Sequence, residues 1–265
     1  MDRRFLIIGA LLTLFSFRGY AQGTKEDLQT EAGARVSVTL DKKLVKGLHI
    51  TADAEGRLSE NMKDFGRYQF GAGISYKALD FLKIGAGYTY ISKKNSSDIW
   101  KPRHRVYGDV MLSYKTGGWR FSLKERLQLT HRDIGNPYQK VPNVVELKSR
   151  LKAAYKFSNR FEPYAYVELR TRMNDPACTA TWNESTSSYS DYSFKGYTDT
   201  YFNRLRGAIG AEYKLSTNHA LDFFFLTDYC YEKNVDTNAE GTKLKSLTYE
   251  RDLNFSLGIG YTFSF

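Results

Sequence analysis

Basic side chains recur at alternate positions in many segments of this chain, and the chemistry they offer is the binding or repulsion of ions. Acidic side chains share these positions but are fewer. If the positions face one enclosed space, the charges either pair and close it with salt bridges, or leave unpaired cations that keep it hydrated and recruit anions. The candidate lining residues are Arg57, Arg67, Lys83, Arg105, Asp109, Lys124, Arg126, Arg150, Glu168, Arg170, Arg204, Arg206, Glu212, Asp222 and Asp228.

Glu125 breaks the alternation, because it is an acid at an apolar position of the segment 119–129. Ser149 and His131 fall on the same type of position nearby. An acid, a serine and a histidine on one face are the residue types of a hydrolase, so a lipid-modifying enzyme is one hypothesis. The spacing matches no recognised motif and no oxyanion donor can be named. We therefore expect no catalytic residue, and either a bulge that turns Glu125 inward or a local hydrogen-bonded pair.

The cysteines and histidines do not have the spacing of a metal site. Cys178 and Cys230 lie in separate segments, and the four histidines are scattered without a close pair. We expect neither a metal nor a cofactor. In an exported chain a disulfide between Cys178 and Cys230 could persist, and it would tether a long loop to a neighbouring strand.

Strands must position these side chains, because apolar and polar residues alternate with a period of two. In residues 32–40, Ala32, Ala34, Val36, Val38 and Leu40 alternate with small or polar residues. Abundant Tyr and Phe (20 and 17) and scarce Pro (5) also suit strands. The same alternation recurs in ten further segments, at 48–55, 67–77, 82–90, 106–114, 119–129, 147–157, 161–173, 201–215, 221–231 and 253–265.

The connections between these segments alternate in length. Short turns are predicted near residues 78–80, 116–118, 158–160 and 216–219, and long polar loops at 92–103, 133–146, 174–199 and 233–248. Aromatic residues gather near the short turns and again near the long loops, where the second group includes Tyr68, Tyr88 and Tyr201. Two aromatic belts around an aliphatic band are typical of a barrel that crosses an outer membrane, with the short turns in the periplasm.

The pattern predicts an all-β fold, a transmembrane antiparallel up-and-down β-barrel. Bacterial barrels of this kind have an even number of strands, with both termini on the periplasmic side. Only eleven strands are apparent, so either the polar segment 22–31 forms another strand, or it threads the lumen, or the count is incorrect. We expect twelve strands, with ten as the alternative.

The N-terminus has the features of an export signal. A basic start at Arg3 and Arg4 is followed by the apolar run 5–15 and by small residues up to Ala21. That run is too short for a spanning helix, which needs about twenty residues. We expect a signal peptide at residues 1–21, cleaved near Ala21, and a barrel domain at 22–265. A chain exported to the outer membrane of a Gram-negative bacterium is not expected to bind nucleic acid, although its formal net charge is +10.

Residues 253–265 resemble the C-terminal signature of outer-membrane proteins, with Tyr261, Phe263 and Phe265 at alternate positions. This resemblance implies recognition by the outer-membrane assembly machinery through Phe265. The stretches 120–129, 147–155 and 161–169 resemble an uncharacterised family of Bacteroidetes outer-membrane barrels, named only as the domain of unknown function DUF2490. That resemblance implies the barrel fold and contact with outer-membrane lipids, and it carries no known activity.

Three hypotheses for function follow. The preferred one is a structural or narrow-pore barrel with a cation-rich charged lumen. The alternative is an anion-favouring channel, whose partners would be small anionic solutes. The second alternative is the membrane-embedded lipid-modifying enzyme. Single-channel conductance separates the first two hypotheses, and release of labelled lipid products tests the third.

Overall fold

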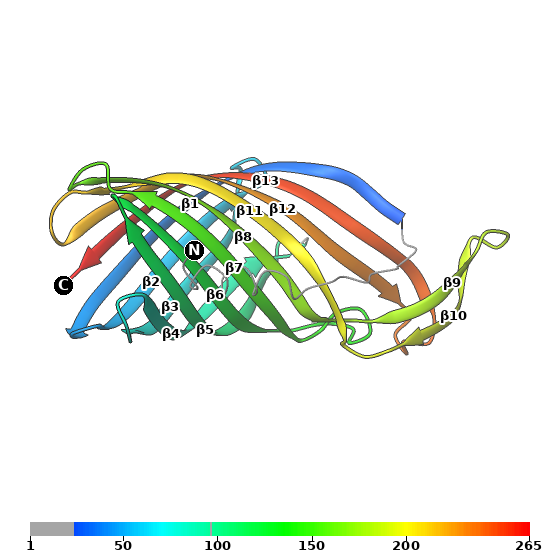
Figure 1. Ribbon diagram of the computed structural model, residues 1–265. Helices are drawn as coiled ribbons and strands as arrows, with labels where there is room; N and C mark the ends of the chain where they lie inside the picture. The colour runs from blue at the N-terminus through cyan, green and yellow to red at the C-terminus, as the bar shows by residue number, and fades with distance from the viewer. Residues whose placement is uncertain (1–23, 96) are drawn as a thin grey trace.

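The computed structural model describes residues 24–95 and 97–265, and these residues form a closed barrel with a small separate hairpin (Figure 1). The predicted signal peptide at residues 1–21 lies outside the described residues. The hairpin consists of β9 (Cys178–Asn183) and β10 (Ser188–Phe194). The barrel strands are β1 (Thr24–Val45), β2 (Leu48–Ser59), β3 (Asp64–Lys77), β4 (Leu82–Lys94), β5 (Trp100–Thr116), β6 (Trp119–Arg132), β7 (Asn143–Tyr155), β8 (Phe161–Asp175), β11 (Asp199–Lys214), β12 (His219–Thr237) and β13 (Leu244–Ser264).

The barrel has eleven strands, so both the expected twelve and the alternative of ten are wrong for the described part of the chain. A separate strand at 22–31 was one of three alternatives, but from Thr24 onward this segment is continuous with the first strand. An odd number of strands makes β1 and β13 run in the same direction, and they close the barrel as a parallel pair in which Arg35 lies opposite Gly258. All other neighbours in the barrel are antiparallel.

The last residue helps to seal this parallel seam. The backbone N–H of Phe265 donates to the carbonyl of Asp41 at 3.0 Å, and the N–H of Lys43 donates to the carbonyl of Phe265 at 3.0 Å. The Phe263 and Phe265 rings stack with their centroids 5.2 Å apart. These bonds satisfy backbone groups that would otherwise form an open sheet edge.

The two ends of the barrel differ, although less than predicted. Connections of two to five residues lie at one end, the turn end; those at the other, the loop end, range from four residues between β2 and β3 to ten between β6 and β7, and include the β9–β10 hairpin. At the turn end, Gly117 and Gly118 join β5 to β6 with positive φ angles of 52° and 88°. Two consecutive positive φ angles are the geometry of a tight hairpin turn, which glycine adopts without steric cost.

At the loop end the strands are longer than the alternation predicted. β12 and β13 continue past the end of the predicted strands. β9 and β10 form inside the predicted loop 174–199, and in Figure 1 this hairpin lies beyond one end of the barrel. Val235, Leu244, Leu247 and Tyr249 form a small buried core there, against which Tyr189 of β10 packs. These strands bury their apolar residues against one another, so the alternation of a two-faced wall does not apply to them.

The outer face of the barrel wall is apolar and exposed. Val36, Ile74, Val167 and Ile209 are 49–63% exposed and lie on β1, β3, β8 and β11, on different sides of the barrel. Among the described residues no helix is long and apolar enough to cross a membrane.

Glu125 remains on this outer face, and the register of β6 with both neighbours is continuous, so the expected bulge is absent from this part of the structure. The second expectation, a local pair, is confirmed, because the Ser149 hydroxyl donates to Glu125 Oε2 at 2.6 Å.

Tyr201 was expected on the outer aromatic belt, but its hydroxyl donates to Asp175 Oδ2 at 3.2 Å. Two register shifts between β8 and β11, on either side of Tyr201, account for its departure from strict alternation.

Candidate functional site: two charged walls inside the barrel

Ion pairs between strands that are not neighbours place the charged side chains inside the barrel. Arg35 on β1 lies 3.1 Å from Asp228 on β12, although β13 runs between these strands. Arg172 on β8 lies 3.3 Å from Glu232 on β12, with β11 between them. In a closed barrel such second-neighbour contacts are shortest on the concave face. The alternation therefore puts the charges in the lumen.

Asp228 and Glu168 are the centres of two groups of buried ion pairs. Arg206 binds Asp228 in a bidentate manner at 2.6 and 2.8 Å. Glu168 accepts from Arg150 Nε at 2.8 Å and from Arg204 at 3.0 Å. The side chains of Asp228 and Glu168 are only 6% and 3% exposed. Bidentate pairs between guanidinium and carboxylate groups are among the strongest polar contacts in proteins, so these carboxylates hold several arginines in fixed positions.

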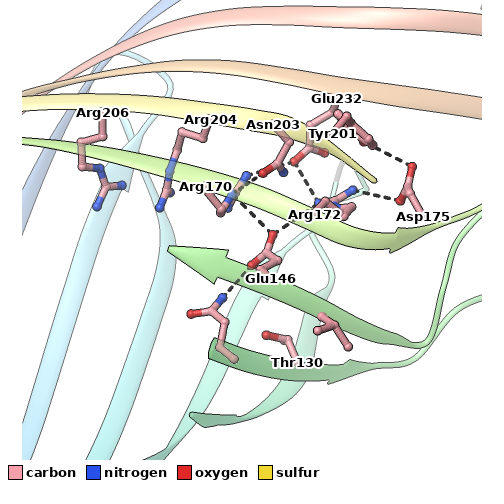
Figure 2. A network of polar contacts seen from close by, with 12 residues as sticks. Thr130, Glu146, Arg170, Arg172, Asp175, Tyr201, Asn203, Arg204, Arg206 and Glu232 are labelled. Atoms are coloured by element: carbon pink, nitrogen blue, oxygen red, sulfur yellow. Dashed lines mark hydrogen bonds and ion pairs between the residues drawn. The ribbon is translucent and has the colours of Figure 1, made fainter. Parts of the chain in front are cut away.

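A second group of pairs continues this network toward the loop end (Figure 2). Glu146 accepts from the Gln128 amide at 2.6 Å and lies 3.4 Å from Arg170 and 3.7 Å from Arg172. Arg172 also lies 3.4 Å from Asp175. We call Glu146, Glu168, Arg170, Arg172, Arg204, Arg206 and Asp228 the paired wall; these residues come from β7, β8, β11 and β12.

Smaller charged groups extend from this wall toward the turn end. Asp109 lies 2.6 Å from Arg126 and 2.9 Å from Lys124, and the Arg126 guanidinium lies 3.7 Å from the centre of the Tyr107 ring. Asp222 accepts from the Tyr164 hydroxyl at 2.9 Å. The remaining predicted lining residues contribute less. Lys83 lies opposite Lys77 near the turn end, and Glu212 is 4.0 Å from Lys214.

The opposite part of the lumen carries cations without acids between them. Arg35, Arg57, Arg67 and Lys93 occupy directly opposed positions on β1, β2, β3 and β4. Like charges at directly opposed positions are destabilising. Arg103 and Arg105 follow on β5, and Arg67 interacts repulsively with both. We call Arg57, Arg67, Lys93, Arg103 and Arg105 the basic wall.

The contacts of the basic wall leave most of its charge unbalanced. Arg57 binds Glu55 on its own strand. Arg67 donates only to the neutral Gln69, at 2.6 Å, and its buried Nε has no partner among the described residues. Arg105 donates to the Thr130 hydroxyl at 3.0 Å. Within the described residues no carboxylate lies in ion-pair distance of Arg67, Lys93, Arg103 or Arg105.

The alternation of the sequence predicted much of the paired wall, but some residues of the paired wall and of the basic wall lay outside the predicted strands. Lys93, Arg103 and Glu146 fell inside or at the edge of predicted loops, as did Asp175, which pairs with Arg172 of the paired wall, although the structure places all four in strands. The available signal was the period of two. Lys93 continues the alternation of Thr89 and Ile91, and Arg103 precedes Arg105 by two positions.

The structure does not join the two cysteines, and it separates His131 from Glu125 and Ser149. Cys178 and Cys230 are free thiols in this structure, so the disulfide stays a prediction. Burial raises the pKa of the Cys178 thiol. His131 lies opposite Asn143, whereas Ser149 lies opposite Glu125, six positions along the strand from His131. Within the described residues no cluster of His, Cys, Asp and Glu could hold a metal ion.

A family model described as "Protein of unknown function (DUF2490)" matches residues 33–239. The chain belongs to the DUF2490 family. No curated protein matches the chain. The DUF2490 match includes all the residues of the paired and basic walls and most of the barrel, and it ends before β13.

Proposed function

We propose that this DUF2490 chain is an outer-membrane β-barrel with a narrow, charge-lined lumen, and that its role is structural or that of a restricted pore. The observation that carries the proposal is the division of the wall into an apolar outer face and a charged inner face. Val36, Ile74 and Ile209 are about half exposed or more. Soluble monomers rarely expose apolar surface over more than a limited patch, whereas a membrane barrel needs such a band on all its sides.

Aromatic contacts at both ends of the barrel support the membrane setting. At the turn end Trp119 and Tyr155 lie with their ring centroids 4.9 Å apart, and at the loop end Tyr68 and Trp100 lie 5.1 Å apart. Aromatic rings favour the two membrane–water interfaces. We place the turn end in the periplasm and the loop end outside the cell, after export and cleavage near Ala21. We expect Tyr261, Phe263 and Phe265 to be read by the assembly machinery.

The narrow lumen follows from strand number and side-chain length. Eight strands enclose a space that side chains fill, whereas 16–18 strands leave an aqueous channel. Eleven strands lie between these cases, and arginine side chains are long enough to restrict such a space. The buried pairs of Arg206 with Asp228 and of Arg204 with Glu168 hold them in place. We infer that the paired wall constricts the passage.

Conductance of the purified barrel in planar bilayers tests this function. We expect wild-type channels far smaller than those of a general porin, or no channels, and larger ones after Arg204→Ala with Arg206→Ala, because two long side chains leave the constriction. Lys83→Ala near the turn end is the control and should leave conductance unchanged. Large, stable wild-type channels would contradict the proposal.

A topology measurement tests the membrane orientation separately. With eleven strands, the start of β1 and the turn before β12 lie at opposite ends of the barrel. In a background without native cysteines, Gln29→Cys should react with an impermeant thiol reagent on intact cells, and Asn218→Cys should react only after the outer membrane is opened. Labelling of both from outside would reject the orientation.

The basic wall favours one second candidate, an anion-favouring passage. Fixed cations lower the barrier for anions and raise it for cations. If the barrel conducts, its reversal potential in a salt gradient should indicate anions, and Arg67→Glu with Arg105→Glu should shift it toward cations. The preference should weaken near 1 M salt, where the Debye length falls to about 3 Å.

We do not favour a lipid-modifying enzyme. Ser149 is bonded to Glu125, but His131 lies six residues along the strand, on the order of 20 Å away at about 3.3 Å per residue, and it contacts Asn143. A base at that distance cannot accept a proton from the serine. Incubation with labelled outer-membrane lipids should release no product, and release that Ser149→Ala abolishes would overturn this view.

A further inference from the structure

The basic wall presents several cationic groups to one space. Arg57, Arg67 and Lys93 are directly opposed on three consecutive strands. Directly opposed residues have Cβ atoms about 4.5–5.5 Å apart on a sheet face. Arg103 and Arg105 lie on the next strand, and Coulomb repulsion links Arg103 with Lys93 and both arginines with Arg67. Their charged ends therefore form one cluster.

Three acids near this cluster already have polar partners, and only one of the three, Glu55, pairs with a member of the cluster. Glu55 binds Arg57. Glu232 lies 3.3 Å from Arg172 and Glu146 accepts from the Gln128 amide, both as part of the network of the paired wall. The cluster consequently keeps a surplus of positive charge that these carboxylates do not balance. Unbalanced charge inside a protein stays hydrated or binds a counterion.

The cluster is also accessible, in contrast to the paired wall. Lys93 is exposed although it lies on the inner face, and the Arg57 side chain is 23% exposed. In the paired wall, Glu168 is 3% and Arg206 is 9% exposed. Space of the size of a water molecule or larger thus adjoins the basic wall.

One donor of the basic wall is buried and unsatisfied. Arg67 Nε has no hydrogen-bond partner among the described residues, so it is available to a bound acceptor.

We propose that the basic wall binds a soluble, multiply charged oxyanion, of the class of phosphate, pyrophosphate, or a molecule that carries a phosphate or sulfate ester. Arginine presents a planar fork of donors that matches two oxygens of such a group, and lysine adds a mobile point charge. Several cations around one space favour an anion that carries more than one charge, because each added charge interacts with all of them.

The position of the wall selects a soluble ligand over a lipid. Arg67 and Lys93 lie on the inner face, whereas the apolar side chains of the same strands, such as Ile74 and Ile84, are exposed on the outer face. A lipid headgroup on the outer face is separated from these cations by the sheet. The inference goes beyond the proposed function, because binding in the lumen does not require that the lumen conducts ions.

Calorimetric titration of the full chain, purified in a nonionic detergent at low ionic strength, tests the site with inorganic pyrophosphate as the probe. We expect saturable binding with about one anion per chain. Arg67→Gln with Lys93→Gln should weaken the affinity at least tenfold. The matched control is Lys83→Gln with Lys115→Gln, which removes the same charge near the turn end and should change the affinity less than twofold.

The outcomes that overturn the proposal are specific. Absence of saturable binding to the wild-type chain would reject the site, and equal weakening in the control would show a general effect of net charge. If the double variant fails to fold, as judged by its heat-dependent electrophoretic mobility, Arg103→Gln replaces it with the same expected direction. Displacement of pyrophosphate by micelles that contain phosphatidic acid, but not by orthophosphate or sulfate, would assign the cations to a lipid and reject the lumenal site.

Discussion

The two charged walls of the lumen use the same residue types and reach opposite arrangements. In the paired wall, Glu168 on β8 and Asp228 on β12 pair with arginines of β1, β7 and β11, and each carboxylate contacts at least two cations. In the basic wall, Arg57, Arg67 and Lys93 follow one another across three strands without an acid in the same row. The paired wall is buried, and the basic wall is partly accessible.

This difference indicates that position, not composition, decides what a charged lumen does. A buried carboxylate between two arginines fixes both, because removing it would leave uncompensated charge at low dielectric. A row of cations without such a carboxylate must keep water or an anion close to it. In the functions that we propose, the paired wall restricts the passage and the basic wall binds a solute. The following experiments change one wall at a time.

Breaking the paired wall should have the largest effect. Asp228→Ala removes the carboxylate that contacts Arg35 and Arg206, and the loss of one partner of a buried ion pair costs about 3–5 kcal/mol. The free energy of unfolding in urea, measured on the barrel folded into detergent or lipid, should fall by that order. Asp252→Ala is the control: it removes an acid of β13 for which no ion pair is found within residues 24–95 and 97–265, and it should cost far less. An equal loss of free energy of unfolding in Asp228→Ala and Asp252→Ala would show that the ion pairs of Asp228 do not stabilise the barrel.

Adding an acid to the basic wall should make it resemble the paired wall. Lys93→Glu places a carboxylate opposite Arg67 and near Arg103. We expect a gain in the free energy of unfolding of about 1–2 kcal/mol, because repulsion is replaced by charge-assisted hydrogen bonds. Lys93→Gln separates the two causes, since it removes repulsion without adding a partner and should gain less. Loss of stability in Lys93→Glu would mean that the basic wall is already neutralised.

Salt should affect the two walls unequally. Repulsion between partly accessible cations is screened at high ionic strength, whereas buried pairs are screened much less. The wild-type chain should therefore become more stable between low and moderate sodium chloride, by roughly 1 kcal/mol or less. The variant Arg67→Gln with Lys93→Gln should lose most of this dependence, and Lys83→Gln with Lys115→Gln should retain it. If the stability of the variant Arg67→Gln with Lys93→Gln still depended on salt, the screened repulsion would lie outside the basic wall.

Thiol labelling gives the finest comparison of the two walls. Cys230 on β12 lies opposite Arg204 of the paired wall, and Lys93→Cys in a background with Cys178→Ser and Cys230→Ser probes the basic wall. We expect the engineered thiol to react severalfold faster than Cys230 in a Cys178→Ser background, because its surroundings are accessible. The ratio of the labelling rate with an anionic reagent to that with a cationic reagent should be higher at position 93 than at Cys230. Equal rates and equal charge preference would contradict a difference in access.

Period-two alternation by itself determined the fold class and most of the wall. In 67–77 and 161–173 it assigned each residue to a face, because strand side chains point alternately to the two sides of a sheet. It failed at the loop end, where β12 and β13 extend beyond the wall and pack against β9 and β10. There the apolar residues face one another, and no single period describes them.

Only the tertiary structure decided the strand count and the pairing of the charges. Alternation cannot show that residues from Thr24 onward continue the first strand, because their order comes from parallel pairing with β13, far away in sequence. It also cannot show that Arg206 meets Asp228 while Arg67 meets Lys93, because the register between strands decides which charges are opposed. The sequence assigns a side chain to the lumen, and barrel closure with its register decides whether that side chain has an acid beside it.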